Sequence, residues 1–255
     1  MLLETRNLDV TIAGKQVCRG LGLAIEPGQC WGLLGGNGVG KTTLLHTLAG
    51  LRTPTQGVVL LEGKPLSGLS RLEAARRIGV LFQAADEGFP ATVLETVLIG
   101  RHPHLERWRW ETAQDLTLAR SALHRVGLDD MEGRTITTLS GGERQRLALA
   151  TVLTQDPLLY LLDEPTNHLD LHHQITLLEL LTRPARENGK ALLMALHDVN
   201  LAARFCNHLL LLFGAGETLL GPTDKVLNET HLQRLYGHPI ATLPGPDGRR
   251  VYLPG

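Results

Sequence analysis

The stretch "CWGLLGGNGVGKTTLLHTLAGL", residues 30–51, joins three local patterns in one short segment. The apolar run 30–35 predicts a buried strand, and residues 41–51 have their leucines at helical spacing. Between them lies "GGNGVGKTT" (35–43), in which Gly, four residues, Gly-Lys and Thr follow one another. A strand, a glycine loop and a helix in this order are the context that a phosphate-binding loop requires. The segment therefore predicts an α/β fold with a phosphate site at the end of a strand.

The glycines of this loop would let backbone N–H groups wrap a phosphate closely, while the helix N-terminus adds partial positive charge. Lys41 would reach the β- and γ-phosphates, and Thr42 would ligate Mg²⁺. The alternative is a tight glycine turn before an amphipathic helix. The residues predicted to bind nucleotide here are Gly35, Gly36, Asn37, Gly38, Val39, Gly40, Lys41, Thr42 and Thr43.

The order of the remaining patterns predicts an α/β fold with a mostly parallel sheet. Short alternating stretches in residues 1–30 are typical of antiparallel strands. From about 84 to 155 strand signals disappear and apolar residues follow helical spacing, so we expect an inserted α-helical subdomain. Apolar strands then alternate with helices again, as in a parallel sheet. We predict one phosphate-loop NTPase domain over 1–237 and a hairpin tail over 238–255.

Composition limits the class of protein. The 255 residues are 43% hydrophobic and 20% charged, which is typical of a globular chain. The net charge of −1 gives no basic footprint for nucleic acid. The longest apolar runs are far shorter than the ~20 residues that span a bilayer, and the N-terminus does not predict a signal peptide. The scattered Cys18, Cys30 and Cys206 are expected to be buried and reduced.

Two adjacent carboxylates end the apolar strand "LLYLLDEP" (158–165). Beside a phosphate loop, Asp163 can hold Mg²⁺ through its water shell, and Glu164 can polarise an attacking water. The alternative is that these two acids begin a solvated loop. The phosphate loop favours the catalytic reading.

Two further polar residues follow predicted strands. Gln83 ends "IGVLFQ", where its amide could touch both the metal and the water. His197 follows "ALLMAL" (191–196) and could hydrogen-bond a γ-phosphate or steady the base. A packed or capping histidine is the alternative for His197.

The stretch "TLSGGERQR" (138–146) predicts a helix whose first turn contains residues unfavourable to helix formation. Ser140 and Glu143 have the spacing of a capping box. Gly141 and Gly142 fill the first turn, where each costs up to about 1 kcal/mol relative to alanine. A capping box needs neither glycine, so these two residues point to a separate requirement.

The chain resembles the ATP-binding-cassette (ABC) ATPases over about residues 2–237, in the order and spacing of "GGNGVGKTT", Gln83, "LSGGERQR", "LLYLLDEP", "NHLD" (167–170) and "ALHD" (195–198). The most specific of these motifs is "LSGGE". The resemblance implies that two subunits pack head to tail, each nucleotide lying between one subunit's phosphate loop and the other's signature loop. It assigns Ser140, Gly141 and Gly142 to the γ-phosphate in the opposite site.

The resemblance also implies the cofactors and several residue roles. ATP and Mg²⁺ would be bound, with Thr42, Gln83 and Asp163 around the metal. Glu164 would be the catalytic base and His197 the γ-phosphate contact. Asp170 would belong to the loop joining the two sites, and Gln83 would link Mg²⁺ to the membrane-facing helical region.

Two positions depart from the family's pattern. Ile12 stands where the family often places an aromatic residue under the adenine, so we expect the base to rest on an aliphatic surface. Gly36 replaces the usual proline of the phosphate loop, which would make the free loop more flexible.

Within the family, "LIGRHPH", the spacing to "WRWE" and "NHLDLHHQ" resemble type II importers for iron-siderophores, haem and cobalamin. This implies an ATP-hydrolysing subunit at the cytoplasmic face of the inner membrane, a homodimer when ATP is bound. Its partners would be two polytopic permease subunits and, indirectly, a periplasmic or extracellular solute-binding protein, with no nucleic acid. A soluble ABC ATPase acting on DNA or ribosomes, or as an assembly scaffold, is the alternative.

Two features admit a second interpretation. His168, His172 and His173 contain an i, i+4 pair that could hold a metal, but we do not predict a zinc site there. "RHPHLERWRWE" (101–111) mixes Arg and Trp as a nucleic-acid surface does. We expect it instead to border the groove that receives a membrane subunit.

Overall fold

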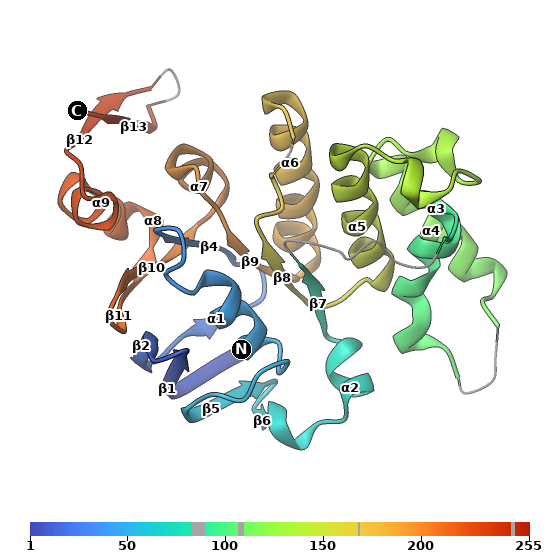
Figure 1. Ribbon diagram of the computed structural model, residues 1–255, viewed down its shortest axis with the longest axis horizontal. Helices are drawn as coiled ribbons and strands as arrows, with labels where there is room; N and C mark the ends of the chain where they lie inside the picture. The colour runs from blue at the N-terminus through green and yellow to red at the C-terminus, as the bar shows by residue number, and fades with distance from the viewer. Residues whose placement is uncertain (83–89, 107–109, 168, 246–247) are drawn as a thin grey trace.

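The computed structural model describes residues 1–82, 90–106, 110–167, 169–245 and 248–255 (Figure 1). Its main sheet has six strands in the order β11-β10-β4-β9-β8-β7, in which every pair of neighbours is parallel except β10 and the edge strand β11. The strands are β4 (Cys30–Gly35), β7 (Ile78–Leu81), β8 (Leu159–Asp163), β9 (Ala191–Ala195), β10 (His208–Gly214) and β11 (Glu217–Pro222). The predicted mostly parallel sheet is confirmed.

The main sheet is buried on both faces, because consecutive side chains of a strand point to opposite sides. In β8, Leu161 packs into the core around α1 (Lys41–Leu48), whereas Leu162 packs into the core formed by the other helices. A strand buried on both faces has no polar alternation, which is why the apolar runs of the sequence mark these strands well.

The N-terminal strands form the predicted antiparallel sheet beside α1 (Figure 1). Its order is β2-β1-β5-β6, with β3 also pairing with β1. The strands are β1 (Leu3–Ile12), β2 (Lys15–Leu21), β3 (Ala24–Ile25), β5 (Gln56–Leu61) and β6 (Lys64–Pro65). Together with α1 they cover one face of the main sheet.

Helices cover the opposite face. Between β7 and β8 the described residues contain α3 (Val93–Leu98), α4 (Ala113–Arg125) and α5 (Gly141–Gln155), which pack together at one end of the molecule (Figure 1). This is the predicted helical insertion, although its limits 84 and 155 and the division at 237/238 stay predictions. The other helices on this face are α6 (Leu171–Asn188), α7 (Val199–Phe205), α8 (Thr223–Val226) and α9 (Glu229–Tyr236), whereas α2 (Arg71–Ala75) packs against the core around α1.

The last residues form an antiparallel pair, β12 (Ile240–Pro244) and β13 (Arg250–Pro254), beside α7 and α9 (Figure 1). In the described ranges, no helix combines the length and apolar character needed to cross a membrane. All three cysteines of the chain are buried and unpaired, as the sequence predicts. Burial raises the pKa of Cys18 and of Cys30 to about 11 and also raises that of Cys206.

Candidate nucleotide-binding site

Three neighbouring strands bring the predicted site residues to one edge of the main sheet. Leu33 of β4, Ala195 of β9 and Asp163 of β8 lie in register with one another. The carboxyl ends of parallel strands meet at the same edge, where ligands of α/β proteins bind. The phosphate loop, the two carboxylates and His197 therefore leave the sheet side by side, from strands up to 165 residues apart in the chain (30 to 195).

Glycine is required in the phosphate loop where it enters α1. Gly40, the N-cap of α1, has φ 111°, and a Cβ there would lie 2.5 Å from Cγ2 of Val17. Gly38 also has positive φ, at 69°. These conformations allow the loop backbone to turn directly into the helix N-terminus. A helix start preceded by such a loop is an anion-binding arrangement.

Lys41 is held inside this loop. Its side chain is buried, with 6% of the residue exposed, and Nζ donates to the carbonyls of Gly35 at 2.9 Å and Gly36 at 3.4 Å. Burial lowers the pKa of Lys41, and the negative charges of Glu164 and Asp163 oppose this effect. The ammonium group therefore stands at the loop, close to where a phosphate would be wrapped by it.

Asp163 has the features of a metal-binding carboxylate. It is 1% exposed, and neither carboxylate oxygen has a hydrogen-bond partner of normal geometry among the described residues. Burial raises its pKa, against the opposing effects of the nearby Thr42 hydroxyl and Lys41. A buried carboxylate without a partner is costly. Since Mg²⁺ prefers oxygen ligands, Asp163 and Thr42 fit this ion.

Glu164 occupies a strained turn that aims its carboxylate at His197. Its φ is 51°, in the left-handed region that non-glycine residues seldom adopt. Glu164 is 8% exposed, and its Oε1 lies 2.5 Å from Nε2 of His197, whose side chain is 43% exposed. The structure thus brings the predicted base and the predicted γ-phosphate contact together.

Two residues that the sequence analysis did not assign support this turn. Asn167 donates its side-chain amide to Glu164 Oε2. Gln145, on α5, donates to the carbonyls of Pro165 at 3.2 Å and Glu164 at 3.4 Å. Both lie inside motifs already quoted, three residues after Glu164 and five after Ser140, and that proximity is the only sequence signal for them.

The signature residues begin α5 on the helical insertion. Ser140 is the N-cap, its backbone N–H donates to Glu143 Oε2 at 2.7 Å, and its Oγ accepts from the N–H of Glu143 at 3.3 Å. These bonds lower the pKa of Glu143. The predicted capping box is present. No hydrogen bond or ion pair recorded for the described residues joins Ser140, Gly141 or Gly142 to the phosphate loop of the same chain.

Among the described residues, Gly141 has no packing partner that would require a glycine. It is exposed, and a Cβ added to it would meet no atom of the described chain within 4 Å. Glycine in the first turn of α5 is less favourable than alanine, and contacts among the described residues of one copy do not explain why glycine is present.

The remaining predicted residues divide into three groups. Asp170 is the N-cap of α6 and pairs with His173, whose backbone N–H lowers the pKa of the Asp170 carboxyl. Ile12 ends β1, is half-buried, and packs against the core around α1. Gln83 and His168 lie outside the described residues, so the predictions for them stay untested. No contact of the described residues tests an adenine site at Ile12.

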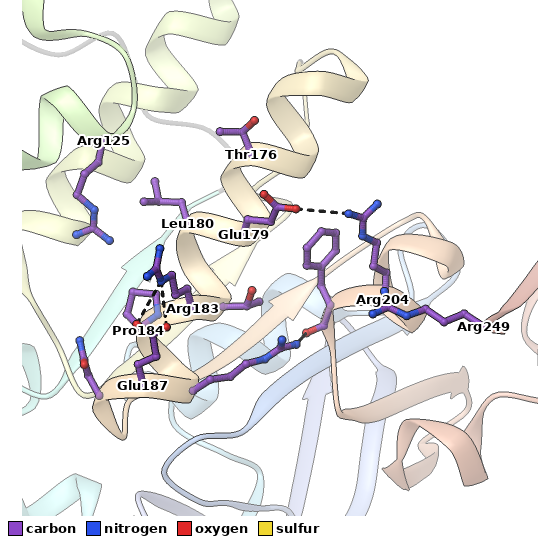
Figure 2. A pocket seen from close by; sticks show the side chains of 13 residues that line it. Arg125, Thr176, Glu179, Leu180, Arg183, Pro184, Glu187, Arg204 and Arg249 are labelled. Carbon is purple, nitrogen blue, oxygen red and sulfur yellow. Dashed lines mark hydrogen bonds and ion pairs between the residues drawn. The ribbon is translucent and has the colours of Figure 1, made fainter. Parts of the chain in front are cut away.

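A separate groove of about 790 Å³ lies between α6 and α7, near the end of α4 and the tail (Figure 2). Arginine side chains dominate it, and two of them pair with glutamates: Arg183 with Glu187 at 3.0 Å, and Arg204 with Glu179 at 3.4 Å. It contains none of the predicted nucleotide-binding residues. The nucleotide site is therefore identified by its chemistry, not by the size of a cavity.

A parallel sheet whose central strand leads through a glycine loop into a helix, with carboxylates ending a nearby strand, defines a phosphate-loop NTPase core. The chain belongs to the ABC transporter family, whose sequence model matches residues 18–167.

Comparison with known proteins agrees with this assignment. The chain is 42% identical over 246 residues to the cobalamin import ATP-binding protein BtuD of Halobacterium salinarum, covering 96% of this chain and 61% of that relative's length. A solved inward-facing structure of a metal-chelate type ABC transporter has a TM-score of 0.86 at 28% identity, covering 100% of this chain and 97% of that one. The dimeric ATP-binding cassette MJ0796 bound to ADP and Pi has a TM-score of 0.76 at 25% identity, covering 87% and 99%.

Proposed function

We propose that this chain is the ATP-hydrolysing subunit of an importer. The observation that carries the proposal is the cluster at the carboxyl edge of the main sheet, where buried Lys41, the unpaired Asp163 and the Glu164–His197 pair meet. Hydrolysis of a nucleotide γ-phosphate needs a phosphate cradle, charge stabilisation and a base near the attacking water. The described residues supply each of these.

Each residue has a distinct role in the proposed reaction. The loop around Gly40 and the Lys41 ammonium bind and orient the phosphates, which supplies positioning and positive charge. The Glu164 carboxylate accepts a proton from the attacking water, and His197 holds that carboxylate in place while reaching toward the γ-phosphate. When bound by Asp163 and Thr42, Mg²⁺ would supply charge neutralisation on the phosphate oxygens.

We further propose that two copies share each nucleotide. Gly141 and Ser140 are exposed at the start of a 15-residue helix, where backbone N–H groups and the helix dipole favour an anion. The absence of any packing reason for Gly141 among the described residues supports an approach by phosphate on a second copy. The dimeric cassette that this fold resembles is consistent with such a pairing.

The proposed cargo is a metal chelate, such as cobalamin, haem or an iron-siderophore. The name of the BtuD relative and the metal-chelate transporter structure support this class. Transport would require two membrane permease subunits, and a solute-binding protein would act through them. We therefore place the chain at the cytoplasmic face of the inner membrane.

The proposal is tested by Glu164→Gln. This variant should bind ATP as the parental protein does but lose about 100-fold or more of its turnover, because a general base contributes about 10²–10⁴ in rate. With ATP present it should elute from a sizing column as a dimer. Glu187→Gln, which removes the same charge in the distant groove, is the matched control and should keep parental turnover. Parental hydrolysis by Glu164→Gln would refute the base assignment.

A further inference from the structure

The tail strand β13 is bonded to the first turn of α7 by one side chain. The Asn200 amide donates from Nδ2 to the Tyr252 carbonyl at 3.0 Å, and its Oδ1 accepts from the Tyr252 N–H at 2.9 Å. The two bonds use both backbone groups of Tyr252, as a neighbouring strand would. A single asparagine thus ties residues 52 positions apart.

The Tyr252 end of this tie is fixed in the core. Tyr252 is 5% exposed, and its hydroxyl donates to the carbonyl of Leu227 at 3.4 Å. The other strand of the hairpin is also anchored, because the N–H of Thr242 donates to Glu229 on α9 at 2.9 Å. Both strands of the hairpin that contacts α7 are therefore held in place.

The Asn200 end of the tie lies three residues after His197. The side chain of Asp198 caps α7 by accepting from the N–H groups of Asn200 at 2.7 Å and Leu201 at 3.1 Å. With seven residues, α7 is too short to be stable by itself, so its direction depends on what it packs against. The backbone that carries His197 enters this turn directly.

A second element, α9, also influences this turn. The Tyr236 hydroxyl of α9 is buried without a hydrogen-bond partner among the described residues. Burial, together with the negative charge of Asp198, raises the pKa of Tyr236 to about 12. Figure 1 shows the hairpin near both α7 and α9. The start of α7 is therefore hydrogen-bonded to the hairpin and lies within electrostatic reach of α9.

We propose that Asn200 is a positioning residue for His197, through which the tail hairpin sets the reach of the imidazole to Glu164. The inference rests on the proposed function, because it takes the Glu164–His197 pair to be part of the ATPase site. The His197 side chain is 43% exposed, so surrounding packing restrains it little and the backbone anchor decides where the ring stands. In the proposed function most of the binding of the nucleotide phosphates comes from the loop around Lys41, which the Asn200 bonds do not touch.

The test is the steady-state kinetics of Asn200→Ala in the full chain. The turnover number kcat should fall about tenfold, because small displacements of a catalytic group cost that much or more, while KM for ATP stays within about twofold. Tyr252→Phe is the matched control: it removes the hydroxyl but leaves both backbone bonds to Asn200, so its kcat should stay within about twofold of parental. In a His197→Ala background, Asn200→Ala should cause no further loss in single-turnover rate.

Two results would overturn this inference and leave the proposed function intact. One is parental kcat for Asn200→Ala while His197→Ala is impaired; the other is an equal further loss when Asn200→Ala is added to His197→Ala. Parental turnover by His197→Ala itself would instead remove the catalytic role of His197, and with it the part of the proposed function on which the inference rests.

Discussion

Two glycines of the phosphate loop illustrate how differently one residue type can be constrained. Gly40 combines a φ of 111° with a Val17 side chain 2.5 Å from where its Cβ would be, so a larger residue is both strained and overpacked. Gly36 does not have positive φ, and a Cβ there would meet no described atom within 4 Å. The fold itself therefore requires glycine at Gly40 and not at Gly36.

We predict that Gly40→Ala lowers the free energy of unfolding by about 2 kcal/mol and weakens ATP binding by about tenfold or more, since the loop cannot keep its shape. Gly36→Ala should change the free energy of unfolding by less than about 0.5 kcal/mol. Urea denaturation followed by tryptophan fluorescence, with nucleotide titration, measures both effects. Equal stability of the two variants would contradict the steric argument.

For individual side chains, the sequence predicts the groups proposed to act in catalysis but not the groups that orient them. Lys41, Asp163 and His197 follow apolar strands, and a parallel sheet necessarily brings such strand ends together. The contact of Asn167 with Glu164 depends on the left-handed turn at Glu164, which the residue type does not indicate. Long-range contacts such as Asn200 with Tyr252 leave no local pattern at all.

Among the elements, α4 owes its position to a buried ion pair at its first turn. Asp115 caps the helix by accepting from the N–H of Thr112 at 2.9 Å, and it accepts from Nε of Arg101 at 2.7 Å. These groups lower its pKa to about 2, the Thr112 N–H being the largest cause. The Arg101 and Asp115 side chains are 13% and 9% exposed, so water screens the pair little.

We expect Asp115→Asn to lower the free energy of unfolding by about 2 kcal/mol at pH 7, since a pKa held below its unfolded value stabilises the ionised fold. This contribution is complete above about pH 4 and disappears as the pH falls toward 2. The difference between parental protein and variant in urea denaturation should shrink over that window. Asp130→Asn, at an exposed position, is the control and should change the free energy of unfolding by less than about 0.5 kcal/mol at pH 7. A constant difference for Asp115→Asn would disprove the ionic origin.

The sequence is most informative for buried elements formed by an uninterrupted run of apolar residues. The strands that end at Asp163 and just before His197 are where their apolar runs predict them. The edge strand β11 was not predicted, because its residues are half-exposed and its pairing with β10 is all that makes it a strand.

For the whole molecule, the proposal of a shared nucleotide site depends on the start of α5, where Gly141 is exposed. A methyl group at Gly141 would clash with nothing described, and alanine is the better helix former. The sequence predicts a role for Gly141 through the family's motif. A surface proposed to contact a second copy makes no contacts within one copy from which that role could be inferred.

Gly141→Ala should therefore raise the free energy of unfolding by up to about 1 kcal/mol and yet lower ATP turnover by about tenfold or more, because the methyl group blocks backbone approach to phosphate. Gly133→Ala, at an exposed glycine that is equally free of neighbours, should leave turnover unchanged. Thermal denaturation and phosphate release measure the two effects. A stabilised Gly141→Ala protein with parental turnover would exclude the shared site.

Mixing two impaired variants tests the same geometry in the assembled state. A Lys41→Ala copy paired with a Gly141→Ala copy has one intact composite site, so an equimolar mixture should regain about a quarter of the parental rate after random pairing. If each copy hydrolyses ATP alone, the mixture should stay as inactive as its components.

The three buried cysteines have a practical consequence for experiments that detect the association of two copies. Their thiols are protonated near neutral pH and shielded from reagents, so maleimide labels should not react with the natural protein. The variant Ser121→Cys, at an exposed position away from the proposed phosphate site, would supply the one reactive thiol, and a fluorophore attached there would report distance without any prior removal of native sulfur.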